Sequence, residues 1–322
     1  MNPQISIVVP LYNESEIFSE LIERLKKLIE ESELSIEVIM VDDGSQDNTP
    51  ELMKELSLNN RNFNSVFLSR NFGHQIALSA GLKYASASEA VMIIDGDLQD
   101  PPELLNEFYK LFKQGYDVVY AIRKNRKENA LKKLAYKYYY KFQKRVANID
   151  IPLDSGDFSL ISRKVVDIII NMPEESRYIR GLRTWAGFKQ TGFEYERAGR
   201  LKGKTKYNFK QLFKLAFNGI FNFSELPIKF ITFLGIITTS LSLFYLGTVL
   251  FKKIIWNSVP EGFTAIIVSI TLFGGIQLIC FGILGEYIVR IFFQVKNRPH
   301  FIVKDFIKNN TPDISGQTDN TK

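Results

Sequence analysis

The chain has 322 residues, of which 45% are hydrophobic and one is cysteine, and its formal net charge is +6. This apolar content excludes a disordered chain, and a single cysteine excludes a disulfide scaffold or a zinc-ribbon protein. The positive charge predicts an anionic partner: nucleic acid, phosphate or lipid head groups.

The first 125 or so residues alternate between short apolar, strand-like runs and helical patterns. Strands are expected at residues 5–10, 36–41, 65–68, 90–94 and 117–121, and helices at 16–31, 49–56 and 75–85. This alternation predicts an α/β fold with a mostly parallel sheet that is covered by helices on both faces. In such sheets ligands bind at the carboxyl ends of the strands.

Acidic residues gather where three of these strands end. Glu14 follows the first strand, Asp42 and Asp43 end the second, and Asp95 and Asp97 follow the fourth. Each one alone could be a turn or a helix cap, but together they predict a site for a hard cation, Mg²⁺ or Mn²⁺. Because no Gly-x-Gly-x-x-Gly or Gly-Lys-Ser/Thr loop follows the first strand, a nucleotide diphosphate held through a metal is favoured over a dinucleotide.

Residues 123–145 combine ten Lys or Arg with one acid and several interleaved tyrosines. A helix at the membrane surface is favoured over nucleic-acid binding, because no RNA- or DNA-binding motif accompanies the stretch. A solvated or subunit-facing helix remains an alternative. We therefore expect membrane lipid, and no nucleic acid, as a partner.

The second part of the chain is strongly apolar. Residues 230–251 and 263–284 are two runs of 22 residues without a charge, long enough to cross a bilayer, and predict a transmembrane hairpin within residues 226–290. Two buried helices of a soluble core are the alternative. Residues 208–225 predict an amphipathic helix in the membrane interface, or one packed on the soluble domain. Basic flanks place both termini in the cytoplasm, and residues 291–322 form a cytoplasmic segment whose tail, from about Asn309, is expected to be disordered.

Three ordered motifs carry a resemblance to a known family. Residues 9–14 (VPLYNE), 41–47 (VDDGSQD) and 95–102 (DGDLQDPP) resemble the GT-A glycosyltransferases of family 2. Residues 154–158 (DSGDF) and 200–207 (RLKGKTKY), with the two-helix anchor, are similar to the polyprenyl-phosphate glycosyltransferases, relatives of dolichyl-phosphate mannose synthase. The resemblance covers residues 5 to about 300 and implies a GT-A catalytic domain over residues 1–207.

The resemblance also implies roles for individual residues. The nucleotide of the donor would contact Pro10, Tyr12, Glu14, Asp42, Asp43 and Asp95. A divalent metal would be held by Asp95, Asp97 and Gln99, and the acceptor phosphate by Arg123, Arg200, Thr205 and Lys206. Asp157 matches the family's proposed catalytic carboxylate. A phosphate monoester is already ionised near pH 7, so Asp157 is either a base or a group that orients a substrate.

The implied activity is the inverting, metal-dependent transfer of one sugar from a nucleotide-sugar to polyprenyl phosphate, for cell-surface glycan modification. UDP-glucose is the first choice of donor; UDP-N-acetylglucosamine, a modified arabinose donor and GDP-mannose stay open. Residues 180–185 (RGLRTW) resemble the Q-x-x-R-W signature of processive synthases, but the Gln is absent and Thr184 separates Arg from Trp. Two spans are also too few for a polymer channel, which favours a single transfer.

Three other functions are weighed: transfer to another lipid or glycan, a non-catalytic nucleotide-sugar-binding scaffold, and a small transporter subunit. The Asp95 and Asp97 pair disfavours a scaffold, and spans without an internal charge disfavour a transporter. The resemblance implies a homotetramer in the bacterial inner membrane, with the catalytic domain in the cytoplasm.

Overall fold

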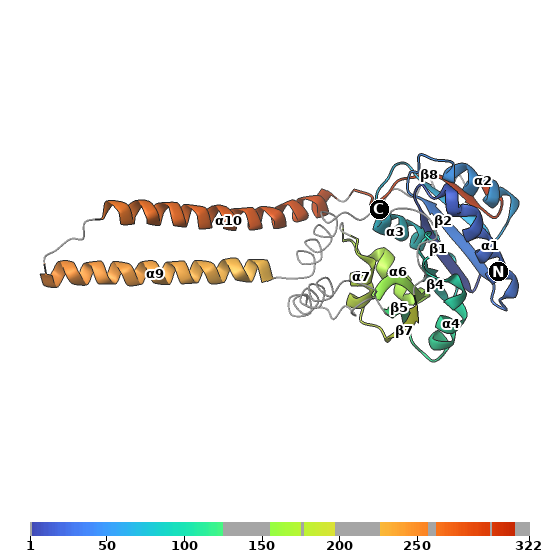
Figure 1. Cartoon of the computed structure of the whole chain (residues 1–322), viewed down its shortest axis with the longest axis horizontal. Helices are drawn as coiled ribbons and strands as arrows, with labels where there is room; N and C mark the ends of the chain where they lie inside the picture. The colour runs from blue at the N-terminus through green and yellow to red at the C-terminus, as the bar shows by residue number, and fades with distance from the viewer. Residues whose placement is uncertain are drawn as a thin grey trace. The chain divides into compact units, whose positions relative to one another are not determined.

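The computed structural model describes residues 2–124, 155–174, 177–196, 226–256, 262–296 and 298–312 (Figure 1). The chain divides into two compact units, one built around a β-sheet and the other around two long helices. The predicted interface helix at 208–225, most of the basic stretch at 123–145, and the candidate acceptor residues Arg200, Thr205 and Lys206 lie outside the described residues.

The first unit contains a nine-stranded sheet with the order β7-β5-β6-β4-β1-β2-β3-β8-β9. Its strands are β1 (Ile5–Leu11), β2 (Ile36–Asp42), β3 (Phe63–Leu68), β4 (Ala90–Ile93), β5 (Val118–Lys124), β6 (Ser155–Ser162), β7 (Gln190–Glu196), β8 (Val303–Lys308) and β9 (Thr311–Pro312). All five strands expected in the first part of the chain are present, within a few residues of their predicted bounds.

The sheet is mixed, which corrects the expectation of a mostly parallel one. The core strands β3, β2, β1 and β4 are parallel neighbours, but β6 pairs antiparallel with β4 and β5, and β8 pairs antiparallel with β3. Parallel neighbours require a crossover connection. Antiparallel neighbours, such as β6 with β4 and β8 with β3, do not need such a connection.

Helices cover both faces of this sheet. One core lies between the sheet and α1 (Ser15–Glu31), α2 (Thr49–Asn59) and α4 (Leu105–Lys113), the last preceded by the short η1 (Pro102–Leu104). On the other face lie α3 (His74–Tyr84), α6 (Arg163–Asn171) and α7 (Ile179–Trp185), which contact one another and the sheet. All seven residues of β1 are buried because the strand is covered on both sides.

The helix α3 approaches the sheet closely at a glycine. A Cβ placed on Gly81 would lie 2.3 Å from Val8 and 3.1 Å from Val41, so a larger residue there would push the helix away from β1 and β2. The start of α3, which lies at the carboxyl edge of these strands, is thereby fixed relative to the sheet.

The chain returns to the sheet after the two long helices. In β8, Ile307 pairs with Ser65 of β3, and the ring of Phe306 packs against Tyr84 with centroids 4.6 Å apart. The sequence analysis did not predict this strand, and the expected disorder from Asn309 is wrong for β9, which pairs with β8. Residues 313–322 are outside the described part.

The second unit contains α9 (Leu226–Trp256) and α10 (Phe263–Lys296), which contact each other and run antiparallel (Figure 1). Both predicted apolar runs are therefore helical. Among the described residues, one segment, Phe273–Lys296, is long and apolar enough to cross a membrane. Large apolar side chains are exposed along both helices, including Phe244 at 74% and Leu278 at 73%.

The contact of β8 with α3 can be tested by truncating one side chain. Phe306 is 6% exposed, whereas Ile302, in the same segment, is 44% exposed. We predict that Phe306→Ala lowers the free energy of unfolding by about 3 kcal/mol, because it removes a buried ring, and that Ile302→Ala costs much less. Denaturant unfolding of the purified protein in detergent measures both. Equal losses would mean that β8 does not stabilise the sheet.

Candidate active site

The loops that follow β1 and β2 are bound to each other. Asn13, with a positive φ of 53°, donates its backbone N–H to Ser45 Oγ at 2.9 Å, and its Oδ1 accepts the N–H of Gln46 at 2.8 Å. Asp47 Oδ2 accepts the N–H of Ser15 at 3.1 Å. Together these contacts hold the predicted donor residues Tyr12 and Glu14 of the first loop next to the second loop, and Pro10 lies just before them in β1.

Asp42 and Asp43 are buried and oriented by backbone amides. Asp42 Oδ1 accepts the N–H of Ser45 at 3.1 Å, and the carboxylate of Asp43 accepts those of Phe72 and Gly73 at 2.7 and 2.9 Å. Burial raises the pKa of both carboxyls, although these hydrogen bonds oppose the shift. The pair therefore fixes the loops after β2 and β3.

Asp95 and Asp97 lie in a tight turn after β4. A Cβ on Gly96 would lie 2.6 Å from Leu11 Cδ2 and 3.1 Å from the carbonyl oxygen of Pro10, so the turn packs directly against the end of β1. Asp97 Oδ1 accepts the N–H of Gln99 at 3.2 Å. The turn thus lies beside the predicted donor residues.

Asp95 carries the electrostatic signature of a crowded acidic site. Burial, together with the carboxylates of Asp100, Asp157 and Asp97, raises the pKa of Asp95 to about 6, although His74 opposes the shift. A set of hard oxygen donors with excess negative charge fits a divalent cation. No group of three or more His, Cys, Asp or Glu side chains arranged to hold a metal is found in the described part of the chain. The protein ligands present fit a metal shared with a phosphate-bearing substrate.

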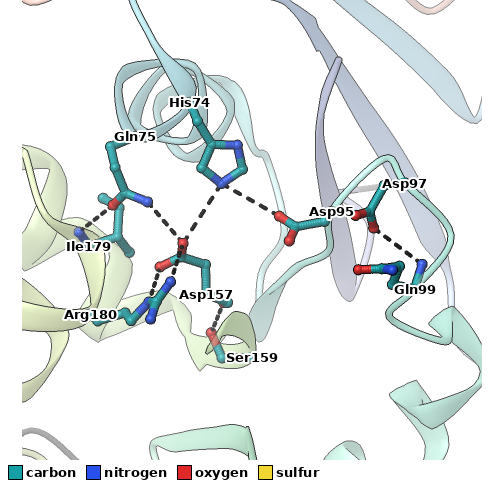
Figure 2. Close-up of polar contacts among 9 residues, drawn as sticks. All are labelled: His74, Gln75, Asp95, Asp97, Gln99, Asp157, Ser159, Ile179 and Arg180. Atoms are coloured by element: carbon teal, nitrogen blue, oxygen red, sulfur yellow. Dashed lines mark hydrogen bonds and ion pairs between the residues drawn. The ribbon is translucent and has the colours of Figure 1, made fainter. Parts of the chain in front are cut away.

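Asp157, on β6, is buried, and several side chains contact its carboxylate (Figure 2). Arg180 donates from Nε to Oδ1 at 2.9 Å and from Nη2 to Oδ2 at 3.2 Å, and Gln75 Nε2 donates to Oδ2 at 2.9 Å. Burial would raise the pKa of Asp157, but the Arg180 guanidinium and His74 outweigh it and hold the pKa well below the usual range. Asp157 is therefore an ionised carboxylate with little capacity to take up a proton.

His74, the first residue of α3, stands between the two acidic groups (Figure 2). Its Nε2 lies 3.5 Å from Asp95 Oδ1 and 3.7 Å from Asp157 Oδ2. Burial lowers the pKa of His74, but Asp157 and Asp95 outweigh it and raise the pKa to about 9. An imidazolium at this position offsets part of the negative charge of both carboxylates.

Arg123 lies at the far side of this edge, on β5, opposite Tyr195 of β7. Tyr195 donates its hydroxyl to Asp100, and a Cβ on Gly156 would lie 3.5 Å from Arg123 Nη2. This places Arg123 close to the strand that carries Asp157.

The structure thus brings most of the predicted site residues to one edge. The loops after β1, β2 and β4 contact one another, and Asp157 joins them through His74. The sequence analysis assigned none of His74, Gln75 and Arg180 to the site. The resemblance of residues 180–185 to Q-x-x-R-W was the available signal for Arg180, but the missing Gln and the interposed Thr184 set it aside.

Another arginine of α7, Arg183, is fully buried, and within the described structure none of its three guanidinium nitrogens has a hydrogen-bond partner. Its guanidinium carbon lies 5.2 Å from the centroid of the Tyr120 ring. Burial lowers the pKa of Arg183 to about 10. Arg177, by contrast, donates to the carbonyls of Met172 and Ile169 and to Ser79.

Comparison with known proteins gives consistent results. The profile described as Glycosyl transferase family 2 matches residues 6–169. A Bacillus subtilis protein named "Uncharacterized glycosyltransferase YkcC" is 43% identical over 302 residues, covering 94% of this chain and 93% of its own. The "Prophage bactoprenol glucosyl transferase homolog" of Escherichia coli is 35% identical, covering 94% and 98%, and the "Bactoprenol glucosyl transferase" of Shigella phage SfII is 35% identical, covering 95% and 99%.

The mixed α/β sheet, with acidic turns that meet at one edge, is consistent with a GT-A-like fold. With the profile match over half of the chain and relatives above 30% identity along nearly its full length, the chain belongs to glycosyl transferase family 2.

The two buried arginines, Arg183 and Arg177, allow a matched test of how a buried guanidinium affects stability with and without hydrogen bonds. Arg183→Met removes a buried guanidinium without hydrogen bonds and should leave stability unchanged or raise it by about 1–4 kcal/mol. Arg177→Met removes three hydrogen bonds and should destabilise the protein by about 2–5 kcal/mol. Thermal unfolding compares the variants. A strong loss of stability in Arg183→Met would show that its guanidinium has partners that offset its burial.

Proposed function

We propose that the protein is a membrane-bound glycosyltransferase that moves one sugar from a nucleotide-sugar to polyprenyl phosphate with inversion. The observation that carries this proposal is the match along nearly the whole chain to proteins named bactoprenol glucosyl transferase, since bactoprenol is a polyprenyl alcohol. The same names support glucose as the transferred sugar, and we propose UDP-glucose as its donor.

The donor would bind at the edge formed by the loops after β1, β2 and β4. We assign its nucleotide to the loops of Pro10, Tyr12 and Glu14 and of Asp42 and Asp43, which are bound together as described. Mg²⁺ or Mn²⁺ would be held by Asp95, Asp97 and Gln99. A divalent ion there would stabilise the negative charge that develops on the leaving diphosphate.

The state of Asp157 bears on the choice of acceptor. A sugar hydroxyl needs a base to remove its proton, and a carboxylate paired with Arg180 is a weak base. A phosphate monoester is already ionised near pH 7 because its second pKa is about 6. The site therefore favours a phosphate acceptor over a glycan hydroxyl. In this role Asp157 would orient the substrates and stabilise the positive charge of an oxocarbenium-like transition state.

The acceptor phosphate would be bound by cationic groups. Arg123 lies near the strand of Asp157, and we assign Arg200, Thr205 and Lys206 to the same role from their motif alone.

The sheet supports a membrane hairpin with two crossings. Because β8 belongs to the same sheet as β1 to β7, the chain before α9 and the chain after α10 lie on the same side of any membrane. It must then cross an even number of times. With Phe273–Lys296 as one span, α9, which contains the uncharged run 230–251, would be the other. The basic flanks support a cytoplasmic location for the catalytic domain and both termini.

The helix α10 is longer than one crossing needs. Its 34 residues extend about 50 Å at 1.5 Å per residue, against a hydrocarbon core of about 30 Å. Near its C-terminal end, Arg290 donates to Glu286 at 2.7 Å, so these two charges are paired. We place this end of the helix at the cytoplasmic interface.

The proposed reaction is tested by incubating the purified protein with undecaprenyl phosphate, a panel of nucleotide-sugars and Mg²⁺ or Mn²⁺, and identifying the lipid product by mass spectrometry. We expect a glucosylated lipid phosphate from UDP-glucose, and no product after chelation of the metal. Absence of glycolipid with every donor would overturn the proposal.

The metal assignment is tested by Asp97→Ala. Transfer should fall by at least about 100-fold, because charge on the leaving diphosphate is no longer stabilised. Binding of UDP-glucose in the presence of Mn²⁺, measured by calorimetry, should also weaken. Asp167→Ala, which removes an exposed carboxylate on α6, is the matched control and should keep full activity. Unchanged turnover of Asp97→Ala would remove this residue from the metal site.

The membrane topology is tested with single cysteines in a Cys280→Ser background. A thiol introduced by Asn257→Cys, between the helices, should react with a membrane-impermeant maleimide in intact cells. A thiol introduced by Lys308→Cys, on β8, should react only after permeabilisation. Protection of the first thiol, or labelling of the second in intact cells, would contradict the two-span hairpin.

A further inference from the structure

Gln75, the second residue of α3, uses both atoms of its side-chain amide (Figure 2). Its Nε2 donates to Asp157 Oδ2 at 2.9 Å, and its Oε1 accepts the backbone N–H of Ile179 at 2.8 Å. Ile179 is the first residue of α7, and an N–H at that position has no partner within its own helix. One side chain therefore joins β6, α3 and α7.

Arg180, the next residue of α7, completes the arrangement. Its guanidinium contacts both oxygens of Asp157 in the two-pronged geometry that arginine forms with carboxylates. Gln75 holds the start of α7 and Arg180 extends from it, so both residues determine where the carboxylate of Asp157 points. The Asp157 side chain is 5% exposed, which leaves a small part of it accessible to a substrate.

The start of α3 is itself anchored. The carboxylate of Asp43 accepts the N–H groups of Phe72 and Gly73, immediately before His74 and Gln75. Behind this loop, Gly44 has a positive φ of 70°, and a Cβ on it would lie 2.5 Å from the backbone of Arg70. The loop is thus held against the end of β2, and Gln75 extends from a fixed base.

We propose that Gln75 and Arg180 are positioning residues that hold the carboxylate of Asp157 in its working orientation. The inference deepens the proposed function, because the reaction that it would affect is the proposed sugar transfer. Neither residue was singled out by the sequence motifs. Stability alone does not require this arrangement, because well-packed apolar residues are often at least as stable as a buried ion pair.

A kinetic test separates positioning from simple stabilisation. Gln75→Ala should lower kcat for transfer by about 10- to 100-fold while the KM for the donor changes less than about 3-fold, because the interaction matters in the transition state. In an Asp157→Asn background the same change should have little further effect, since the group being positioned has already lost its charge. Gln114→Ala, an exposed glutamine at the end of α4, is the control.

Arginine substitutions add a second comparison. Arg180→Lys keeps the charge but loses the two-pronged contact, so kcat should lie between wild type and Arg180→Met. The pair of Arg24 with Glu103 has the same geometry on another part of the domain, at 2.9 and 2.6 Å, and Arg24→Lys should leave kcat unchanged. Wild-type kcat in Gln75→Ala, Arg180→Lys or Arg180→Met would overturn the proposal.

Hydrogen exchange, which does not depend on sugar transfer, allows the positioning proposal to be tested separately from the proposed function. Hydrogen exchange of the full-length protein should become faster in peptides that cover residues 177–185 when Gln75→Ala removes the acceptor of the Ile179 N–H, and stay unchanged in Gln114→Ala. If wild type transfers no sugar, the proposed function fails while the exchange result still decides whether Gln75 holds α7. Unchanged exchange in Gln75→Ala would overturn the positioning proposal in either case.

Discussion

Mutual repulsion among carboxylates is the constraint that the rest of the site satisfies. Acidic side chains end or follow β1, β2 and β4, Asp157 lies near the start of β6, and different groups offset their charges. Asp42 and Asp43 are held by backbone amides, Asp157 by the Arg180 guanidinium, and Asp100 by the hydroxyl of Tyr195. At Asp95, burial and then the remaining repulsion from Asp100, Asp157 and Asp97 raise the pKa to about 6. Carboxylates are therefore crowded at the turn of Asp95 and Asp97, where a bound cation would offset their repulsion.

The hydrogen bonds that offset these charges also explain how distant parts of the chain form one site. Asp43 fixes the loop before α3, the first residues of α3 contact Asp157, and Gln75 holds α7. Each link is a hydrogen bond between a buried polar group and a backbone or side-chain partner, and leaving any of them unmade costs more than the bond itself contributes. The geometry of the site therefore depends on how α3 packs against the sheet. The close approach at Gly81 makes this packing possible.

The sequence predicts the first five strands and the acidic edge because both depend on local patterns. Apolar runs mark β1 and β2, and the loops after them carry their acidic residues in order. The strand β8 was not predictable in this way. Its residues, VKDFIK, show no clean alternation, and their partner β3 is more than 200 residues away, as the bond from Asn309 to Asn64 illustrates. The partners that hold Asp157 were not predictable for a related reason, since Gln75 and Arg180 come from two separate helices, α3 and α7.

The pairing of Asp157 with Arg180 links the structure of the site to the chemistry of its substrate. An enzyme that activates a hydroxyl needs a carboxylate whose pKa lies near the working pH, and burial without a counter-ion would provide one. Here a guanidinium has the opposite effect, lowering the pKa and fixing the orientation of the group. A carboxylate that is a weak base but has a fixed orientation suits a nucleophile that is already ionised when it binds. If the acceptor is a lipid phosphate, as proposed, the site does not need a base, and Asp157 would supply a rigid negative charge to stabilise the positive charge that develops on the sugar.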